Sequence, residues 1–350
     1  MRVALAISDH GWGHLNRSLV TAAEVVRRGH ALALVINASM EAEVRRACPD
    51  AEVLTGPLDR GYVFAPGGSV DHDASRPLLH ASAIGAPAAL AEAVARWRPD
   101  VVMADATPWA PALACAADAP AVLCSNFSWD DQYLAMYGAT AEVERVRAQV
   151  AAFDLGLELP LGSGLPAVAE RRTVPLLAQW PGTSLPPAID AARPLVTWTM
   201  GRTPPEAQPL DALRGLAEGC ARRGFQLAVN EVLAPYAGKA AIALPDHVAW
   251  SDVLAASCLV VTKAGYSTVA EALRGPGYVA MAGVTGLTEE RAMIADVEAR
   301  GWGLGVAVAD PNFDARFLAA IDALLRRVPR PPTDEAGEYA IVDALEAIAG

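Results

Sequence analysis

Short apolar runs alternate with helical patterns from the start of the chain. The apolar runs 3–7 and 31–36 are each followed by a segment with helical spacing, over 15–28 and near 40–47. Runs of this kind form strands that helices cover on both faces, as in a parallel sheet. The pattern predicts an α/β fold, and it continues with a helix over 87–97, a strand over 101–104, a helix over 108–117 and a strand over 121–124.

A second series of the same kind follows a proline-rich segment. Residues 168–194 contain five prolines, which interrupt helices and strands alike and indicate an interdomain linker. We therefore predict one α/β domain over 1–180, a second over 190–330, and a helix within 333–350 that crosses back to the first. The expected elements of the second domain are strands over 195–199, 225–229, 248–250, 259–262 and 278–281, and helices over 210–223, 267–274, 289–300 and 315–327.

Composition narrows the class of protein. A chain of 350 residues is long for one core, and 53% hydrophobic with 19% charged residues excludes a disordered chain. The formal net charge of -12 argues against a nucleic-acid partner. The five cysteines form no C-x-x-C pair, and no apolar stretch approaches the roughly 20 residues of a spanning helix. The first residues do not resemble a signal peptide, so we expect a cytoplasmic protein.

A glycine-rich loop follows the first predicted strand. Residues 8–18 are Ser-Asp-His-Gly-Trp-Gly-His-Leu-Asn-Arg-Ser, in which the glycines let backbone N–H groups approach an anion at the next helix N-terminus. A tight turn with His14 as a polar helix cap is the alternative. Asp105 ends the predicted strand 101–104 on the same sheet edge, where a carboxylate can orient an imidazole that acts as a base. The alternative for Asp105 is a cap for the helix that starts at Pro108.

The run 262–272 is the sharpest motif of the second half. Gly265 ends a buried strand, Ser267 and Thr268 offer hydroxyls and backbone N–H groups at a helix N-terminus, and Glu271 lies one turn further. Such a corner fits a diphosphate, and the carboxylate fits ribose hydroxyls. The alternative is a capping box, because Thr268 and Glu271 are three residues apart.

Together, the two motifs resemble the nucleotide-sugar-dependent glycosyltransferases of GT-B architecture, the UDP-glycosyltransferase superfamily. The resemblance implies two Rossmann-like parallel-sheet domains that face a central cleft. It implies that His14, after Gly13 and before Arg17, is the acceptor-activating base and that Asp105 pairs with it. It also implies that a corner of the second domain holds the donor, with these residues on the diphosphate and ribose: Gly265, Tyr266, Ser267, Thr268 and Glu271.

Two further stretches extend the resemblance to the donor. Val248 and Trp250 correspond to the loop that receives the nucleotide base, although Trp250 also fits ordinary core packing. Gly201, Arg202 and Thr203 follow the first strand of the second domain and resemble a second phosphate-facing loop. An arginine there can face phosphate charge, and it can equally be a solvated surface residue.

One motif departs from the family pattern. Many relatives place an acidic residue or histidine before Gln to hold the donor sugar, whereas this chain has Thr-Glu-Glu-Arg at 288–291. We assign Glu290 and Arg291 to the sugar; an arginine could favour a carboxylated sugar, and a surface salt bridge between the two is the alternative. For the acceptor we expect the long loop 55–75 to border the cleft, and the following side chains to contact the substrate: His10, Trp12, Asn126, Phe127 and Trp129.

The resulting prediction is a glycosyltransferase that moves a sugar from a UDP- or dTDP-sugar to a hydroxyl or amine of a small-molecule acceptor. A single base with direct displacement implies inversion at the anomeric carbon. We expect no cofactor and no metal, because helix N-termini can neutralise the leaving group, and because the nearest acidic pair, Asp71 and Asp73, lies in a loop. The alternatives are a nucleotide-sugar hydrolase of the same fold and a noncatalytic sugar-nucleotide-binding subunit.

Overall fold

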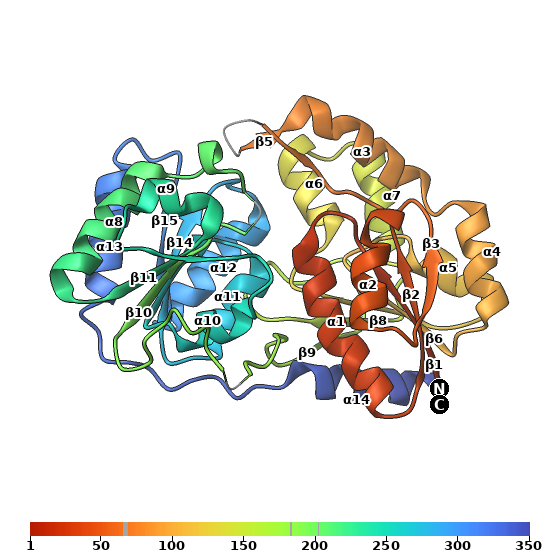
Figure 1. Cartoon of the computed structure of the whole chain (residues 1–350). Helices are drawn as coiled ribbons and strands as arrows, with labels where there is room; N and C mark the ends of the chain where they lie inside the picture. Colours follow the sequence, from red (N-terminus) through yellow and green to blue (C-terminus); the bar gives the residue numbers. More distant parts are fainter. Residues whose placement is uncertain (66–68, 183, 202) are drawn as a thin grey trace.

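Two lobes, each built on a parallel sheet, make up the molecule (Figure 1). The computed structural model describes residues 1–65, 69–182, 184–201 and 203–350. Both sheets have helices on either side, so the predicted α/β class with two Rossmann-like domains is confirmed. No single helix within these ranges is long and apolar enough to cross a membrane, although the bent pair 72–84 and 88–97 passes by length and composition.

The first sheet has the order β3-β2-β1-β6-β7-β8-β9, with every neighbouring pair parallel. The chain begins in the middle of this sheet. Strands β2 and β3 are added on one side of β1, and β6 to β9 are added on the other, so the strand order reverses between β1 and β6. That reversal point is where open α/β sheets bind ligands. The strands are β1 (Arg2–Ile7), β2 (Ala31–Ile36), β3 (Glu52–Thr55), β6 (Val101–Asp105), β7 (Ala121–Ser125), β8 (Leu155–Glu158) and β9 (Arg171–Thr173).

Helices bury both faces of this sheet. Val3, Leu5 and Ile7 of β1 pack in one cluster with residues of α1 and α14, whereas Ala4 and Ala6 pack in another with residues of α3 to α7. This two-sided burial explains why the central strands are uninterrupted apolar runs. The helices are α1 (Trp12–Arg27), α2 (Glu41–Ala47), α3 (His72–Ile84), α4 (Ala88–Trp97), α5 (Ala110–Ala116), α6 (Trp129–Tyr137), α7 (Ala141–Val150) and α14 (Gly337–Ala349), with a 3-10 turn Ala38–Met40.

The second sheet repeats the same topology, with the order β12-β11-β10-β13-β14-β15 and all pairs parallel. Its reversal point lies between β10 and β13. The strands are β10 (Leu195–Trp198), β11 (Gln226–Asn230), β12 (Ile242–Leu244), β13 (Leu259–Lys263), β14 (Tyr278–Gly283) and β15 (Gly303–Ala307). The helices are α8 (Leu210–Arg223), α9 (Ala234–Ala237), α10 (Trp250–Ala256), α11 (Tyr266–Leu273), α12 (Thr288–Ala299) and α13 (Phe313–Leu324), with 3-10 turns Pro205–Ala207 and Glu231–Leu233.

Three predicted boundaries differ from the structure. The strand predicted over 248–250 is wrong, because the edge strand is β12 and Trp250 begins α10. The predicted linker includes β9, whose polar residues Arg171–Thr173 pair with β8 at the sheet edge and so carry no hydrophobic signal. The predicted loop 55–75 contains the antiparallel hairpin β4 (Val63–Phe64) and β5 (Val70–Asp71), and α3 already starts at His72, where the Asp71 side chain accepts from the Ala74 N–H.

The chain passes between the lobes twice, and the two passages lie against each other. The Leu176 N–H donates to Glu335 Oε2 at 2.8 Å, and the Gly337 N–H donates to the Leu176 carbonyl at 3.1 Å. After the second passage, α14 packs on α1 and β6 of the first lobe, which puts the C-terminus beside the N-terminus (Figure 1). The last helix therefore belongs to the first lobe in space.

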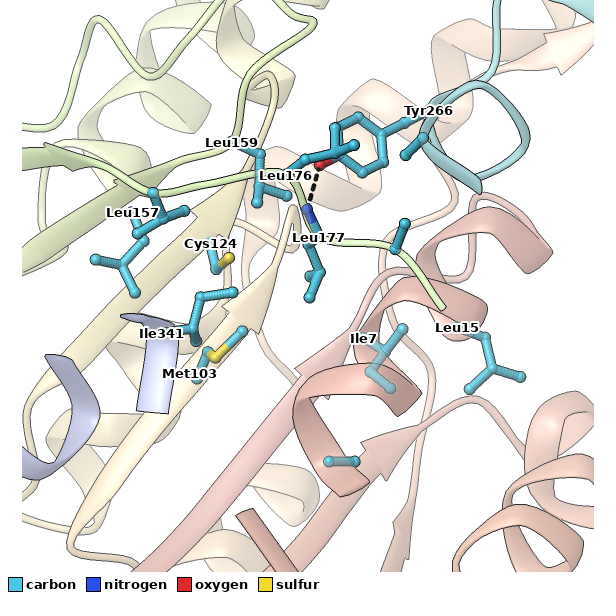
Figure 2. Packing of buried hydrophobic residues seen from close by; sticks show 14 of the residues in the cluster. Ile7, Leu15, Met103, Cys124, Leu157, Leu159, Leu176, Leu177, Tyr266 and Ile341 are labelled. Carbon is cyan, nitrogen blue, oxygen red and sulfur yellow. Dashed lines mark hydrogen bonds between the residues drawn. The ribbon is translucent and has the colours of Figure 1, made fainter. Parts of the chain in front are cut away.

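Tyr266 fixes the first passage against the second lobe. The buried Leu177 N–H donates to the Tyr266 hydroxyl at 3.1 Å, and both side chains belong to one buried cluster that extends to Ile7 and Leu15 of the first lobe (Figure 2). Arg274 lies just after α11, and its guanidinium donates a hydrogen bond to the Ala178 carbonyl at 2.9 Å. The hydrophobic core is thus continuous across the junction of the lobes.

We predict that Tyr266→Phe lowers the free energy of unfolding by about 1–3 kcal/mol, because it leaves the buried Leu177 N–H without an acceptor. Urea unfolding measures this effect. Tyr278→Phe is the matched control, since that hydroxyl donates to Val328 O at an exposed position where water can replace it. Equal losses in the two variants would contradict the prediction.

Candidate active site

The reversal points of the two sheets face each other across the gap between the lobes. In the first lobe, the β1–α1 loop and the end of β6 meet there; in the second lobe, the β10 loop and the β13–α11 loop do. The Ser267 hydroxyl of α11 donates to the Gly13 carbonyl of α1 at 2.8 Å. The two sequence motifs, whose contacting residues are 254 positions apart, therefore come together in one site.

His14 and Asp105 form the hydrogen-bonded pair at the edge of the first sheet. Asp105 is the last residue of β6, beside Ile7 of β1, and His14 lies in the first turn of α1. His14 Nδ1 is 2.8 Å from Asp105 Oδ1, and both side chains are buried. A carboxylate accepts, so Nδ1 carries the proton and Nε2 keeps its lone pair. This geometry is that of an oriented general base.

Asp105 stays ionised because α1 supplies the compensating donors. Arg17 Nε donates to Oδ2 at 2.7 Å, and the Ser18 hydroxyl donates to the same oxygen at 2.8 Å. Burial alone would raise the pKa of Asp105, but the charges of Arg17 and His14 outweigh it and hold that pKa well below its usual range. The alternative role as a helix cap is wrong, since α5 starts at Ala110 with Trp109 as its N-cap.

An aromatic cluster borders the base on the first lobe. The His10 ring lies 4.2 Å from that of Tyr62, 4.8 Å from Trp129 and 6.4 Å from Phe64, measured between centroids. His10 Nδ1 donates to Arg60 O, and burial, with the charge of His14, lowers the pKa of His10 to about 3. The cluster is therefore uncharged at neutral pH.

The structure distributes the predicted acceptor residues unevenly. His10 is half-buried at the mouth, beside the 45% exposed Phe64 that the sequence analysis did not single out. Phe127 and Trp129 are buried behind them, with the Phe127 ring 5.8 Å from His14. Trp12 is half-buried and packs against the large core cluster of the first lobe.

Asn126 bridges the lobes and is fully buried. Its Oδ1 accepts from Arg17 Nη1 at 2.7 Å, and its Nδ2 donates to Glu289 Oε1 of α12 at 3.0 Å and to Leu161 O at 3.2 Å. The side chain expected in an acceptor wall thus connects the base region to the second lobe. The signal in the sequence was only its place after β7, which does not specify these partners.

The N-terminus of α11 forms the corner predicted for a diphosphate. Gly265 is the N-cap, no side chain caps the helix, and Ser267 and Thr268 lie in its first turn. The capping-box alternative is wrong, because Thr268 is inside the helix and cannot be its cap. The Glu271 side chain has no hydrogen-bond partner in the described part of the chain, and burial raises its pKa to about 7. An unpaired carboxyl group of this kind is suited to ligand hydroxyl donors.

Lys263 lies between the two glycine loops of the second lobe. A Cβ on Gly201 or on Gly265 would meet Lys263 Cε at 3.9 or 4.0 Å, and Nζ donates to Thr203 Oγ1 at 3.4 Å. Gly201 has φ +60°, a left-handed conformation that favours glycine. Lys263 is one of only two lysines in the chain, but no motif in the sequence marks it as a site residue. The predicted Arg202 lies outside the described residues.

The remaining predicted donor residues contact other parts of the second lobe. Val248 and the half-buried Trp250 pack against a small buried cluster around Leu195 and Leu244, as the core-packing alternative expected. Tyr266 is buried at the lobe junction, with its ring under the Arg17 guanidinium at 5.1 Å.

Glu290 stabilises its own loop. Its carboxylate accepts from the backbone N–H groups of Val284 and Gly286, both at 2.7 Å, and of Thr285 at 3.0 Å. These bonds stand where the alternative reading placed a salt bridge with Arg291, whose side chain is exposed. Glu289, one residue earlier, is turned toward the first lobe, and burial raises its pKa. The structure therefore brings Glu289 to the site in place of the two residues predicted for the sugar.

No group of three or more His, Cys, Asp or Glu side chains within the described ranges could hold a metal ion. Of the acidic loop pair, Asp71 caps α3.

Comparison with known proteins shows the fold. No protein-family model and no curated protein matches the sequence. Among solved structures, the calicheamicin glycosyltransferase CalG4 matches 99% of this chain over 98% of its own at 20% identity and a TM-score of 0.70. The glycotransferase of kitacinnamycin matches at 18% identity, 100% and 96% coverage and a TM-score of 0.67. The spinosyn rhamnosyltransferase SpnG in complex with thymidine diphosphate matches at 17% identity, 99% and 100% coverage and a TM-score of 0.62. The chain thus has the GT-B fold of these enzymes.

The half-buried Glu271 predicts a pH-dependent stability. With a pKa of about 7 in the folded chain and 4.5 as the ordinary value, the folded state holds a proton that the unfolded state has lost between these values. Stability contributed by this group is therefore present below pH 4.5 and lost as the pH rises through 7.

We expect Glu271→Gln to become progressively more stable than the unchanged protein between about pH 5 and about pH 8, with a constant difference above that. Urea unfolding midpoints across this range measure the effect. Glu92→Gln, at an exposed position on α4, is the control and should shift all midpoints equally. Parallel curves for the Glu271 variant would refute the prediction.

Proposed function

We propose that the protein transfers a sugar from a nucleoside-diphosphate sugar to a hydroxyl or amine of a small-molecule acceptor. One observation carries this proposal: His14, oriented by Asp105, lies on the first lobe beside the N-terminus of α11 on the second. The two loops are in direct contact, since the Ser267 hydroxyl donates to the Gly13 carbonyl at 2.8 Å. The solved structures with this fold are named glycosyltransferases, which supports the same class of reaction here.

The second lobe would hold the donor. The diphosphate fits the N-terminus of α11 and the glycine loops at Gly201 and Gly265, where Lys263 adds a positive charge. Glu271 would accept hydrogen bonds from the ribose hydroxyls. A thymidine diphosphate complex of SpnG and a dTDP complex of VinC support a pyrimidine nucleotide. Glu289, with Asn126, is placed to contact the sugar between the lobes.

The first lobe would hold the acceptor against the uncharged cluster of His10, Tyr62 and Phe64, and a spinosyn aglycone complex of SpnG supports an organic acceptor. His14 Nε2 takes the proton of the attacking hydroxyl or amine while that atom bonds to the anomeric carbon. The bond from this carbon to the diphosphate breaks, and its electron pair leaves with the diphosphate. Asp105 stabilises the imidazolium, and Lys263 stabilises the leaving group. Displacement on one face inverts the anomeric carbon, and the scheme uses no metal or further cofactor.

Turnover of a panel of UDP- and dTDP-sugars, with and without pooled small-molecule acceptors, tests the proposal. We expect product only with acceptor, and a fall in kcat of about 10²–10⁴ in His14→Ala, because the base is lost. His80→Ala is the matched control: this histidine is exposed on α3 and should leave the rate unchanged.

Two other outcomes would replace the proposal. Free sugar formed at the same rate without acceptor would make the protein a nucleotide-sugar hydrolase in which His14 activates water. Tight nucleotide binding with no turnover of any donor would make it a binding subunit.

Lys263 gives a separate prediction about the donor. Lys263→Met should weaken the binding of thymidine or uridine diphosphate about 10- to 100-fold, because a charged donor to the diphosphate is lost. Calorimetric titration measures the affinity. Lys239→Met is the control, since that lysine is exposed and distant in sequence from both glycine loops. Unchanged affinity in the Lys263 variant would place the diphosphate elsewhere.

A further inference from the structure

Arg17 makes more polar contacts in the site than a simple ion pair would. Its Nε donates to Asp105 Oδ2 at 2.7 Å, and its Nη2 donates to Oδ1 at 2.5 Å, so the guanidinium grips both oxygens. The same Nη2 lies 3.0 Å from His14 Nδ1 and 3.2 Å from the Ser125 hydroxyl. The side chain is 3% exposed. A planar fork in this position fixes the carboxylate plane that in turn orients His14.

The other end of the guanidinium leads to the second lobe. Nη1 donates to Asn126 Oδ1, and Asn126 Nδ2 donates to Glu289 Oε1. On one face of the guanidinium lies the Tyr266 ring of α11. Helices α11 and α12 of the second lobe therefore position Arg17. Arg17 in turn positions the His14–Asp105 pair of the first lobe.

We propose that Arg17 is a positioning residue for His14: it sets the orientation and the basicity of the ring, and its alignment depends on Glu289 through Asn126. The inference rests on the proposed function of His14 as a base. The physical reason is the position of the positive charge. The Arg17 guanidinium, with Nη2 3.0 Å from Nδ1, disfavours a positive charge on the His14 ring. It also neutralises the Asp105 carboxylate, which would otherwise favour a positive charge on that ring.

Besides Arg17, other ionisable groups act on the His14 ring. They come from the β6 end, the β1–α1 loop, the loop after β3 and α12, and they are Asp105, His10, Asp59 and Glu289. Three of these four are acids. Removal of the arginine therefore leaves an uncompensated negative environment around His14.

The test follows the six histidines of the full chain by ¹⁵N NMR as the pH is varied, with the His14 signal identified by its loss in His14→Gln. We expect the His14 ring to titrate about one pH unit higher in Arg17→Gln than in the unchanged protein. Arg27→Gln, which removes an exposed arginine from the same helix, should leave the titration in place. If His14 titrates at the same pH in Arg17→Gln, the inference is overturned.

Arg17→Lys separates charge from geometry and serves if the glutamine variant does not fold. A lysine keeps the charge but cannot grip both oxygens of Asp105 and reach Asn126. We expect the His14 titration to stay near its original pH, while kcat falls at least tenfold with an unchanged KM for the donor. A kcat equal to that of the unchanged protein would overturn the positioning role. Because the NMR titration needs no turnover, absence of transferase activity would defeat the proposed function and leave this result readable.

Discussion

The buried carboxylate of Asp105 constrains much of the first lobe. A carboxylate removed from water costs several kcal/mol unless donors replace the lost hydration. All of the replacement comes from the first two turns of α1, through His14, Arg17 and Ser18. The glycine turn between β1 and α1 must therefore deliver this helix with its polar face against the end of β6. The same placement puts the Gly13 carbonyl where Ser267 of the second lobe can reach it.

The two halves of the site differ in how completely their polar groups are paired. On the first lobe, Asp105 and Asn126 are satisfied within the protein, which leaves the base rigid before any substrate arrives. On the second lobe, the Glu271 side chain has no hydrogen-bond partner in the described residues, and Lys263 Nζ has a long 3.4 Å contact with the Thr203 hydroxyl and lies 5.6 Å from the centre of the Phe64 ring. The unmet polar capacity of the site is thus concentrated where the nucleotide is proposed to bind.

The sequence could predict the central strands and the pairing of His14 with Asp105, since both follow from local rules. Strands buried on two faces are continuous apolar runs, and a residue at a strand end lies at the carboxyl edge of the sheet, which located Asp105 opposite His14. The edge strand β9 is polar, so no such rule applied to it. Adjacent helical residues point about 100° apart. The sequence alone did not determine whether Glu289 or Glu290 faces the first lobe. Tyr266 is in the donor motif, yet its hydroxyl binds Leu177, a partner 89 residues away that only the tertiary structure specifies.

The two segments that connect the lobes form one doubled connection. Leu176, Glu335 and Gly337 tie the two passages to each other, and Trp180 Nε1 donates to Glu338 Oε1 at 2.6 Å beside them. Two connections that are bonded to each other restrict the relative movement of the lobes more than one connection would. Figure 1 places the hairpin β4–β5 on the opposite side of the gap from these passages. A rotation of one lobe about these passages would therefore displace the hairpin β4–β5 more than the core that lies beside the passages.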